Sequence, residues 1–228
     1  MVDAVLLDWE GVLADTVAAR RESLLRALAD EAVPFDSANY SARCEGRAVH
    51  AAAADALRSA GRDDAVLTDL VALRATRAFA ERLGKGFVLT AGARELVERL
   101  QSASRVAIVT TATRAETEFV LRLAGLEAAM STIVSADDAL ASPPSPAMYE
   151  RAVEQLQRLR PTRPERVVAI AASSFTVRAA RAAGIRTIAL GVPAHVAVEA
   201  DGAVRDLEGL TLSDLARLAG IETAEHRS

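Results

Sequence analysis

The segment Leu6–Thr16, LLDWEGVLADT, decides the fold and holds the strongest candidate for a functional residue. An apolar run starts at Ala4 and leads into Asp8, which is typical of a buried parallel strand that ends in a carboxylate. Ligands of open α/β sheets bind at the carboxyl ends of such strands. Gly11 has no Cβ, so the chain can turn sharply there beside a ligand. The segment therefore predicts an α/β protein with Asp8 at its functional site.

Strand and helix patterns alternate through the second half of the chain. This alternation predicts an α/β fold with a Rossmann-like parallel sheet and helices on both faces, linked by right-handed crossovers. After the first strand we expect strands at Arg105–Thr110, Thr132–Val134, Val167–Ala171 and Arg186–Leu190. We expect helices at Ala91–Leu100, Ala115–Leu123, Pro146–Leu159, Thr176–Ala183 and Ser213–Leu218, a loop at Pro161–Pro164 and a frayed tail at Glu222–Ser228.

Between the first two predicted strands lies a long, alanine-rich stretch with helical periodicity. Thr16–Ala32, His50–Ala60 and Ala65–Leu83 each repeat apolar residues at helical spacing. We interpret residues 17–85 as a helical cap domain inserted into a core domain formed by residues 1–16 and 86–228. Gly84-Lys85-Gly86 is the expected hinge.

Composition excludes several classes of function. The 228 residues are 51% apolar and 25% charged, which is enough for a sizeable core and a polar surface. The formal net charge of −4 argues against sequence-independent nucleic-acid binding, which needs a basic surface. We expect no membrane span and no secretory signal, because the apolar runs are too short. The single cysteine, Cys44, cannot form an internal disulfide, which fits a cytoplasmic protein.

The segment around Asp8 resembles the nucleophile loop of the haloacid dehalogenase-like (HAD) superfamily, written DxDGTLxDS or DxDGVxxDT. Three further segments carry the resemblance. Phe87–Leu100 resembles the family's segment that returns from the cap to the core, Ser135–Leu140 resembles its acidic loop, and Ala179–Gly184 resembles the helix after its last motif. The pattern is most similar to the phosphoglycolate phosphatase and β-phosphoglucomutase group, which has a helical cap. The resemblance implies that Asp8 is the nucleophile and that Thr110 bonds the transferred group. It implies that Glu10, one methylene longer than the family's Asp, is the general acid/base.

The third and fourth family motifs are degenerate. The third, close to GKPAPDIY in the family, reads SPPSPAMY at Ser142–Tyr149, so Pro143 stands where the lysine belongs. The fourth, FEDSxxGxxAAxxAG, falls on Ile170–Gly184, and Ala171 and Ala172 replace the two acids that help hold Mg²⁺. The family implies a Mg²⁺ cofactor, but Mg²⁺ needs oxygen ligands that are depleted here. We therefore expect no metal ligands and no cofactor.

Few residues are available to replace the missing lysine and acids. Lys85 is the one lysine and lies at the predicted hinge, so Arg114 is the best substitute, although its planar fork differs from an ammonium. Asp137 and Asp138 are candidates to restore metal binding. Haloacid dehalogenases work without metal, and Ser173-Ser174 is loosely similar to their SSN. They keep the lysine, however, which disfavours dehalogenation.

We expect the substrate to contact Trp9, Gly11, Thr111, Arg114 and Arg47. Trp9 adjoins the nucleophile, and the alternative is that it packs under the cap. Arg47 lies in CEGRAVH (Cys44–His50), a segment that resembles the family's substrate-specificity loop. Arg43, which precedes this segment, and His50, which ends it, are candidates to face the cleft together with Arg47. The alternative that these three decorate a helix start at the surface is equally compatible with the sequence.

Three interpretations of function remain open. The first is a divergent hydrolase that uses Asp8 and Glu10 for metal-independent covalent or acid/base chemistry on a small molecule. The second is a pseudoenzyme whose cleft binds a ligand or partner, and the third is a phosphatase rebuilt with Arg114 and Asp137 or Asp138. We favour the first, because Asp8, Glu10 and Thr110 are present together. The sequence indicates neither the substrate nor the oligomeric state.

Overall fold

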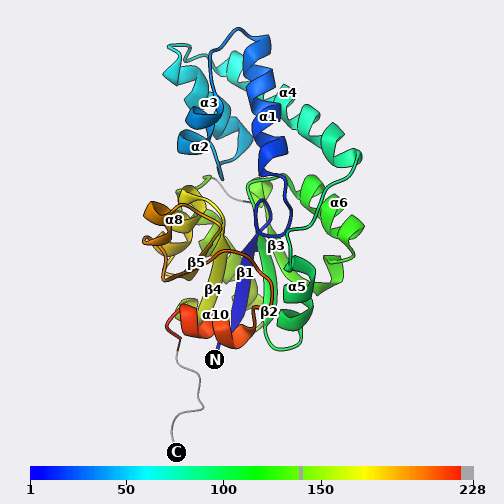
Figure 1. Cartoon of the computed structure of the whole chain (residues 1–228), viewed down its shortest axis with the longest axis vertical. Helices are drawn as coiled ribbons and strands as arrows, with labels where there is room; N and C mark the ends of the chain where they lie inside the picture. Colours follow the sequence, from blue (N-terminus) through cyan, green and yellow to red (C-terminus); the bar gives the residue numbers. More distant parts are fainter. Residues whose placement is uncertain (139–140, 222–228) are drawn as a thin grey trace, which may run out of the picture.

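The computed structural model describes residues 1–138 and 141–221, and its core is a parallel sheet (Figure 1). In these ranges the sheet has six strands in the order β3-β2-β1-β4-β5-β6, all paired in parallel. The strands are β1 (Ala4–Asp8), β2 (Arg105–Val109), β3 (Met130–Val134), β4 (Val167–Ala171), β5 (Arg186–Leu190) and β6 (Gly202–Val204). The predicted α/β class with a parallel sheet is confirmed.

Strand β1, the third in the sheet order, carries Asp8 to the carboxyl edge of the sheet. All five residues of β1 are buried, as expected for a strand covered on both faces. Asp8 pairs with Val109 of β2, and Leu7 pairs with Ile170 of β4. The loops that follow β2 and β4 therefore flank Asp8.

Helices cover both faces of the sheet because residues of each strand alternate between the two sides. Val5 and Leu7 of β1 share an apolar cluster with one set of helices, whereas Ala4 and Leu6 share another with a second set. The first set is α5 (Ala93–Gln101), α6 (Arg114–Ala124) and α10 (Leu212–Leu218); the second is α7 (Ala147–Leu159) and α8 (Ser174–Ala182).

Residues 17–84 form a helical lobe beyond the carboxyl ends of the strands (Figure 1). Its helices are α1 (Val17–Asp30), α2 (Ser37–Arg43), α3 (Val49–Ser59) and α4 (Ala65–Gly84). They bury an apolar cluster of their own that includes Leu24, Leu28 and Leu57. The predicted division into a core domain and a cap domain stays a prediction; we use "helical lobe" for the observed unit.

Several short elements differ from the sequence expectations. Helix α2, the four-residue α9 (Ala194–Ala197) and strand β6 were not predicted, and α8 begins two residues earlier than expected. Single 3-10 turns occur at η1 (Glu127–Ala129), η2 (Ala136–Asp138) and η3 (Pro164–Arg166), the last within and beyond the predicted loop. The predicted tail at 222–228, and the end of the predicted acidic loop at 139–140, lie outside the described residues.

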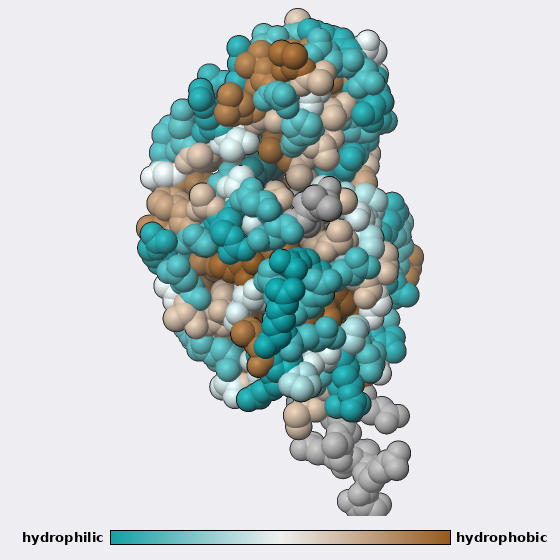
Figure 2. Space-filling view, turned by 180° about the vertical axis from the view of Figure 1, so that it is seen from behind, coloured by the Kyte–Doolittle hydropathy of each residue, from teal (hydrophilic) through white to brown (hydrophobic). Residues whose placement is uncertain are grey.

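The face drawn in Figure 2 is mainly polar. Figure 2 shows hydrophilic residues over most of one face, with apolar residues in separate patches. Among residues 1–138 and 141–221, no helix combines the length and apolar character needed to cross a membrane.

Candidate active site

Asp8 lies almost buried at the end of β1, with 7% of its surface exposed. Its carboxylate accepts hydrogen bonds from the backbone N–H groups of Trp9 and Glu10 and from the hydroxyl of Thr176 in α8. Burial, reinforced by the negative charge of Glu10, raises the pKa of Asp8 to about 8 against these hydrogen bonds. At neutral pH most of this carboxyl group is therefore protonated.

Glu10 is held by Arg20, which comes from the first helix of the helical lobe. The guanidinium Nε and Nη2 lie 2.7 and 2.5 Å from the same oxygen, Oε1 of Glu10. Arg20 Nη1 lies 3.5 Å from Oε1 of Glu116 in α6. Although burial acts to lower the pKa of Arg20, the two carboxylates raise it. This buried network joins the loop after β1, the helical lobe and α6.

Trp9 belongs to the apolar core rather than to the surface of the site. Its ring is fully buried and meets Phe79 of α4 edge-on, with ring centroids 6.0 Å apart. The Arg20 guanidinium carbon lies 3.5 Å from the centroid of the same Phe79 ring. The substrate contact of Trp9 stays a prediction; of the two sequence interpretations, packing under the helical lobe describes its position.

Thr110 and Gly11 flank Asp8 on neighbouring loops. Thr110 is 2% exposed, and its hydroxyl oxygen accepts a hydrogen bond from the N–H of Ala112 at 3.1 Å. Gly11 has a φ of +78°, and a Cβ there would lie 2.9 Å from the Cβ of Ala172. Glycine is thus required for the turn, while its N–H donates to the carbonyl of Ala14. Thr111 is half-buried beside Thr110, and the substrate contacts of Gly11 and Thr111 stay predictions.

The Arg114 side chain contacts groups at the end of β3, which lies two strands away from β1 in the sheet. Its guanidinium Nη2 donates to Asp138 Oδ2 at 2.7 Å and to the carbonyl of Ile133 at 2.9 Å, and its backbone N–H donates to Asp137 Oδ2 at 2.8 Å. Although burial acts to raise the pKa of Asp138, hydrogen bonds from Ser135 and Arg114 lower it. These groups satisfy one another at the end of β3; the replacement of the lysine by Arg114 and the restoration of a metal site by either aspartate stay predictions.

The loop between α2 and α3 seats the helical lobe on the start of α8. A Cβ on Gly46 would lie 2.0 Å from the hydroxyl oxygen of Ser173, and the N–H of Ala48 donates to the hydroxyl of Ser142 at 3.1 Å. Arg47 lies over Phe175, 5.4 Å from its ring centroid, and donates to the carbonyl of Arg43. Arg47 therefore reaches the core at α8, where its contact with substrate stays a prediction.

Arg43 and His50, the other two residues of the predicted specificity loop, face carboxylates on the helical lobe itself. Arg43 Nε lies 2.8 Å from Asp55, and His50 Nε2 lies 2.9 Å from Asp69. The His50 and Asp69 side chains are more than half exposed. These two residues fit the alternative of a helix start at the surface.

The residues around Asp8 do not fit a magnesium ion. Ala171 and Ala172 offer no side-chain oxygen, and the hydroxyl of Ser173 caps α8 through Thr176. The Glu10 carboxylate is occupied by Arg20. Within the part of the chain that the structure describes, no three His, Cys, Asp or Glu side chains are placed to hold a metal. The donor set is thus poor in the oxygen ligands that Mg²⁺ needs.

Sequence reasoning missed Arg20, Glu116 and Thr176. A signal existed for Arg20, because it stands one turn before Leu24 and two turns before Leu28 on the buried face of α1. A charged residue on an apolar helical face is normally paired. Its partner Glu116 gave no such signal, because it is 96 residues away along the chain. A glutamate at this position is also expected for the capping box of α6, without any contact to another element.

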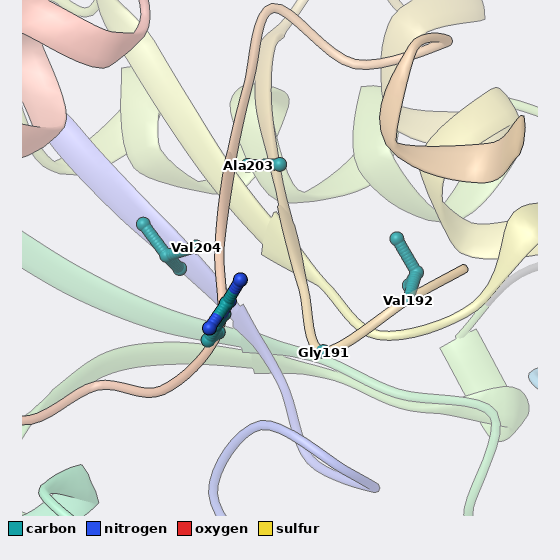
Figure 3. Close-up of a pocket in the computed structure, with 5 residues that line it drawn as sticks. Gly191, Val192, Ala203 and Val204 are labelled. Atoms are coloured by element: carbon teal, nitrogen blue, oxygen red, sulfur yellow. The ribbon is translucent and has the colours of Figure 1, made fainter. Parts of the chain in front are cut away.

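A concave region lies at the β5–β6 edge of the sheet, away from Asp8. Figure 3 shows Gly191 and Val192 after β5 and Ala203 and Val204 of β6 around an open hollow. Its fifth lining residue, Arg205, is exposed and is the one charged group there. The hollow offers no buried polar group to a ligand.

Comparison with known proteins identifies the family of this chain. Residues 2–184 match the sequence model of the family described as haloacid dehalogenase-like hydrolases. The chain belongs to this family. No curated protein matches the HAD chain at a significant level.

Solved structures with the same fold cover nearly the whole HAD chain. CbbY from Rhodobacter sphaeroides, solved as a variant with xylulose-1,5-bisphosphate, is 26% identical with a TM-score of 0.80, covering 94% of this chain and 99% of CbbY. β-Phosphoglucomutase from Clostridium difficile is 14% identical with a TM-score of 0.85, covering 96% and 98%. A predicted phosphoglycolate phosphatase from Haemophilus somnus is 18% identical with a TM-score of 0.73, covering 90% of this chain and 95% of the phosphatase. The last two likenesses concern the fold alone.

Proposed function

We propose that this HAD protein is a divergent hydrolase that acts on a small molecule without Mg²⁺, with Asp8 as nucleophile. The observation that carries the proposal is the position of Asp8. It is buried at the carboxyl end of β1 among backbone N–H groups and the Thr176 hydroxyl, with alanines in place of the metal-binding acids. We also propose that the helical lobe acts as a cap that excludes water, and that the protein is cytoplasmic, in keeping with its single, buried cysteine.

The chemistry proceeds in two displacements. An ionised Asp8 oxygen attacks the acyl carbon of an ester substrate, and the alcohol leaves as an alkoxide with the electron pair of the broken C–O bond, which gives a mixed anhydride between Asp8 and the acyl group. Water then attacks the anhydride and regenerates Asp8 together with the free acid of the substrate. Glu10 accepts the proton of that water, and we assign this role to Oε2 because both contacts with Arg20 fall on Oε1.

A conventional phosphatase role fits the site poorly on electrostatic grounds. Two like charges 4 Å apart repel by about 4 kcal/mol at an effective dielectric constant of about 20. A phosphate dianion beside an ionised Asp8 meets this repulsion twice over, and neither a lysine at position 143 nor acids at 171 and 172 are present to recruit compensating charge. The sugar bisphosphate bound by CbbY is therefore not carried over to this chain.

A second candidate, a binding protein without catalysis, is favoured by one specific observation. Arg20 engages Glu10 in a buried pair, with side-chain exposures of 11% and 14%. To act as a base, the Glu10 carboxylate must accept a proton while it remains paired with Arg20. If the ion pair with Arg20 prevents this proton transfer, the site can bind a ligand but cannot turn it over.

The decisive experiment compares wild type with Asp8→Asn on 4-nitrophenyl acetate and 4-nitrophenyl phosphate, each with Mg²⁺ and with EDTA. Asp15→Asn is the matched control, because it makes the same substitution at an exposed position of the same loop. We expect ester hydrolysis that survives EDTA, persists in Asp15→Asn and disappears in Asp8→Asn. Because the nucleophile is the ionised form of Asp8, the rate rises with pH up to about 8.

A single turnover in H₂¹⁸O identifies the nucleophile directly. Water that attacks the Asp8 carbonyl of the anhydride leaves one ¹⁸O atom in the Asp8 carboxyl group, which mass spectrometry of the Asp8 peptide detects. Turnover with neither this label nor capture of Asp8 as its hydroxamate by added hydroxylamine contradicts nucleophilic attack by Asp8. Phosphate hydrolysis that requires Mg²⁺ and Asp8 supports a rebuilt phosphatase, and no turnover of either substrate supports the binding protein.

A further inference from the structure

Helix α4 of the helical lobe carries apolar residues on two opposite faces. Its inner face contributes Val71, Ala72 and Ala75 to the apolar cluster of the lobe, which also contains Leu24 of α1 and Leu57 of α3. The opposite face is exposed or half-buried, and its residues recur at alternating steps of four and three. We call this face the outer stripe; it consists of Val66, Leu70, Leu73, Arg77, Ala80 and Gly84.

The spacing of the outer stripe is typical of a helix that packs against another helix. Alternating steps of four and three residues keep side chains in one line along an α-helix, as in a coiled coil. A surface helix normally has polar residues opposite its buried face. Val66 and Leu73, however, expose 78% and 49% of their surfaces there. The stripe therefore has the pattern of an interface, although nothing in residues 1–138 and 141–221 covers these two side chains.

Charge divides α4 into an acidic beginning and a basic second half. Asp63 immediately precedes the helix cap, and Asp69 lies in the second turn. Of the arginines in the second half, Arg74 and Arg82 pair with glutamates in or next to α1. Arg77 is exposed within the outer stripe and makes no ion pair among the residues that the structure describes. The stripe thus contains one guanidinium group that is available to a partner.

We propose that the outer stripe binds the outer stripe of a second copy of this chain, with the two α4 helices antiparallel about a twofold axis. This packing sets Leu70 of one copy against Leu73 of the other, and Arg77 against Val66. It places Arg77 within one turn of Asp69 in the other copy, so each acidic beginning faces a basic second half. A parallel pair would set Arg77 against Arg77, and charge therefore favours the antiparallel arrangement.

The dimer joins two helical lobes and does not depend on the chemistry at Asp8. Neither Asp8 nor the buried network of Glu10, Arg20 and Glu116 belongs to the outer stripe. The 20 residues of α4 form a helix about 30 Å long. One pair of such helices buries less than the roughly 1,600 Å² of a standard stable interface. We therefore expect a weak dimer, with a dissociation constant of about 10–100 µM.

The oligomeric state of the full-length protein tests the proposal. Sedimentation equilibrium from about 5 to about 500 µM should show the average mass rising from monomer toward dimer. Leu73→Glu places a carboxylate in the middle of the stripe, and because a twofold dimer contains this change twice, association should weaken by more than about a hundredfold. Since Leu73 is half exposed, the variant should keep the urea midpoint of the wild-type monomer.

Leu123→Glu is the matched control, because Leu123 is an exposed leucine on α6 of the core, outside the outer stripe. This variant is expected to associate like the wild type. Loss of association in Leu123→Glu, or association that survives in Leu73→Glu, would overturn the proposal. A wild type that stays monomeric over the whole range would also overturn it and leave the stripe to a different partner.

Charge reversal tests the antiparallel arrangement. Arg77→Glu sets a carboxylate near Asp69 of the other copy and should weaken association about tenfold, because the contact occurs twice in the dimer. Addition of Asp69→Arg restores opposite charges and should recover most of this loss. A parallel pair would gain nothing from the second substitution, because the two residues at position 77 would still repel each other. Absence of recovery in the double variant would therefore overturn the antiparallel pairing.

Discussion

Removal of the Arg20 guanidinium is expected to destabilise the protein far more than removal of a surface arginine. Arg20→Met leaves Glu10 and Glu116 without their shared cation, and both partners of the closer pair are nearly buried, at 11% and 14% exposure. Breaking a buried pair by removing one partner costs about 3–5 kcal/mol. The contact of Arg20 with the Phe79 ring at 3.5 Å adds about 1 kcal/mol. We expect a loss of about 4–6 kcal/mol in the free energy of unfolding.

Arg82→Met is the matched control for this measurement. Arg82 of α4 pairs with Glu22 of α1 at 2.6 Å, and both side chains are half exposed. This pair joins the same two helices as the contact of Arg20 with Phe79. Such pairs contribute about 0.2–1 kcal/mol. Urea unfolding followed by the fluorescence of Trp9, the one tryptophan, reports on the packing beside Arg20. The reasoning fails if Arg20→Met costs no more than Arg82→Met, or if Arg20→Met together with Glu10→Gln costs the sum of the two single substitutions.

Further predictions concern pH, the contact between lobe and core, and metal. Because the folded pKa of Asp8 is raised from 3.8 to about 8, stability contributed by its neutral form is complete below pH 3.8 and lost as pH rises toward 8. Asp8→Asn should therefore raise the free energy of unfolding at pH 7 by about 2–4 kcal/mol and abolish this part of the pH dependence in urea titrations. Gly46→Ala should lower the free energy of unfolding by about 2 kcal/mol more than Gly61→Ala. Both glycines have a positive φ, but only a Cβ at position 46 would clash with Ser173. Amide hydrogen exchange at residues 44–48 should therefore become faster in Gly46→Ala alone. Mg²⁺ should not raise the melting temperature of wild type, and a rise that EDTA reverses would contradict the poor fit of the site to this ion.

The elements that form the site could be predicted where apolar pattern and chain order were sufficient. Asp8 follows an unbroken apolar run, and a parallel sheet necessarily places Thr110 near it once the second strand is identified. Strand β6 has three residues and half-buried ends, so it lacks the apolar run that marks a strand. The sequence left two positions open for Trp9, because nearness to Asp8 in sequence says nothing about which way the ring turns at the end of a strand.

Electrostatic pairing was the part that sequence could not supply. Arg114 looked available because it follows the second strand, yet its partners Asp138 and the carbonyl of Ile133 belong to β3 and the turn after it. Arg20 looked like one of many arginines on a helix, yet it binds carboxylates from two other elements. Both outcomes depend on distances between elements, which no local pattern encodes.

The charge arrangement also explains why restoring one missing residue would not restore a phosphatase. A lysine in place of Pro143 would add one positive charge but no metal ligand, and an acid in place of Ala172 alone would supply one of the two acids that the family pattern has at positions 171 and 172. In either case Arg20 would still occupy Glu10 at 2.5 Å. The chemistry of this site therefore depends on a buried network that links β1, the helical lobe and α6, and a change of function would require changes in all three.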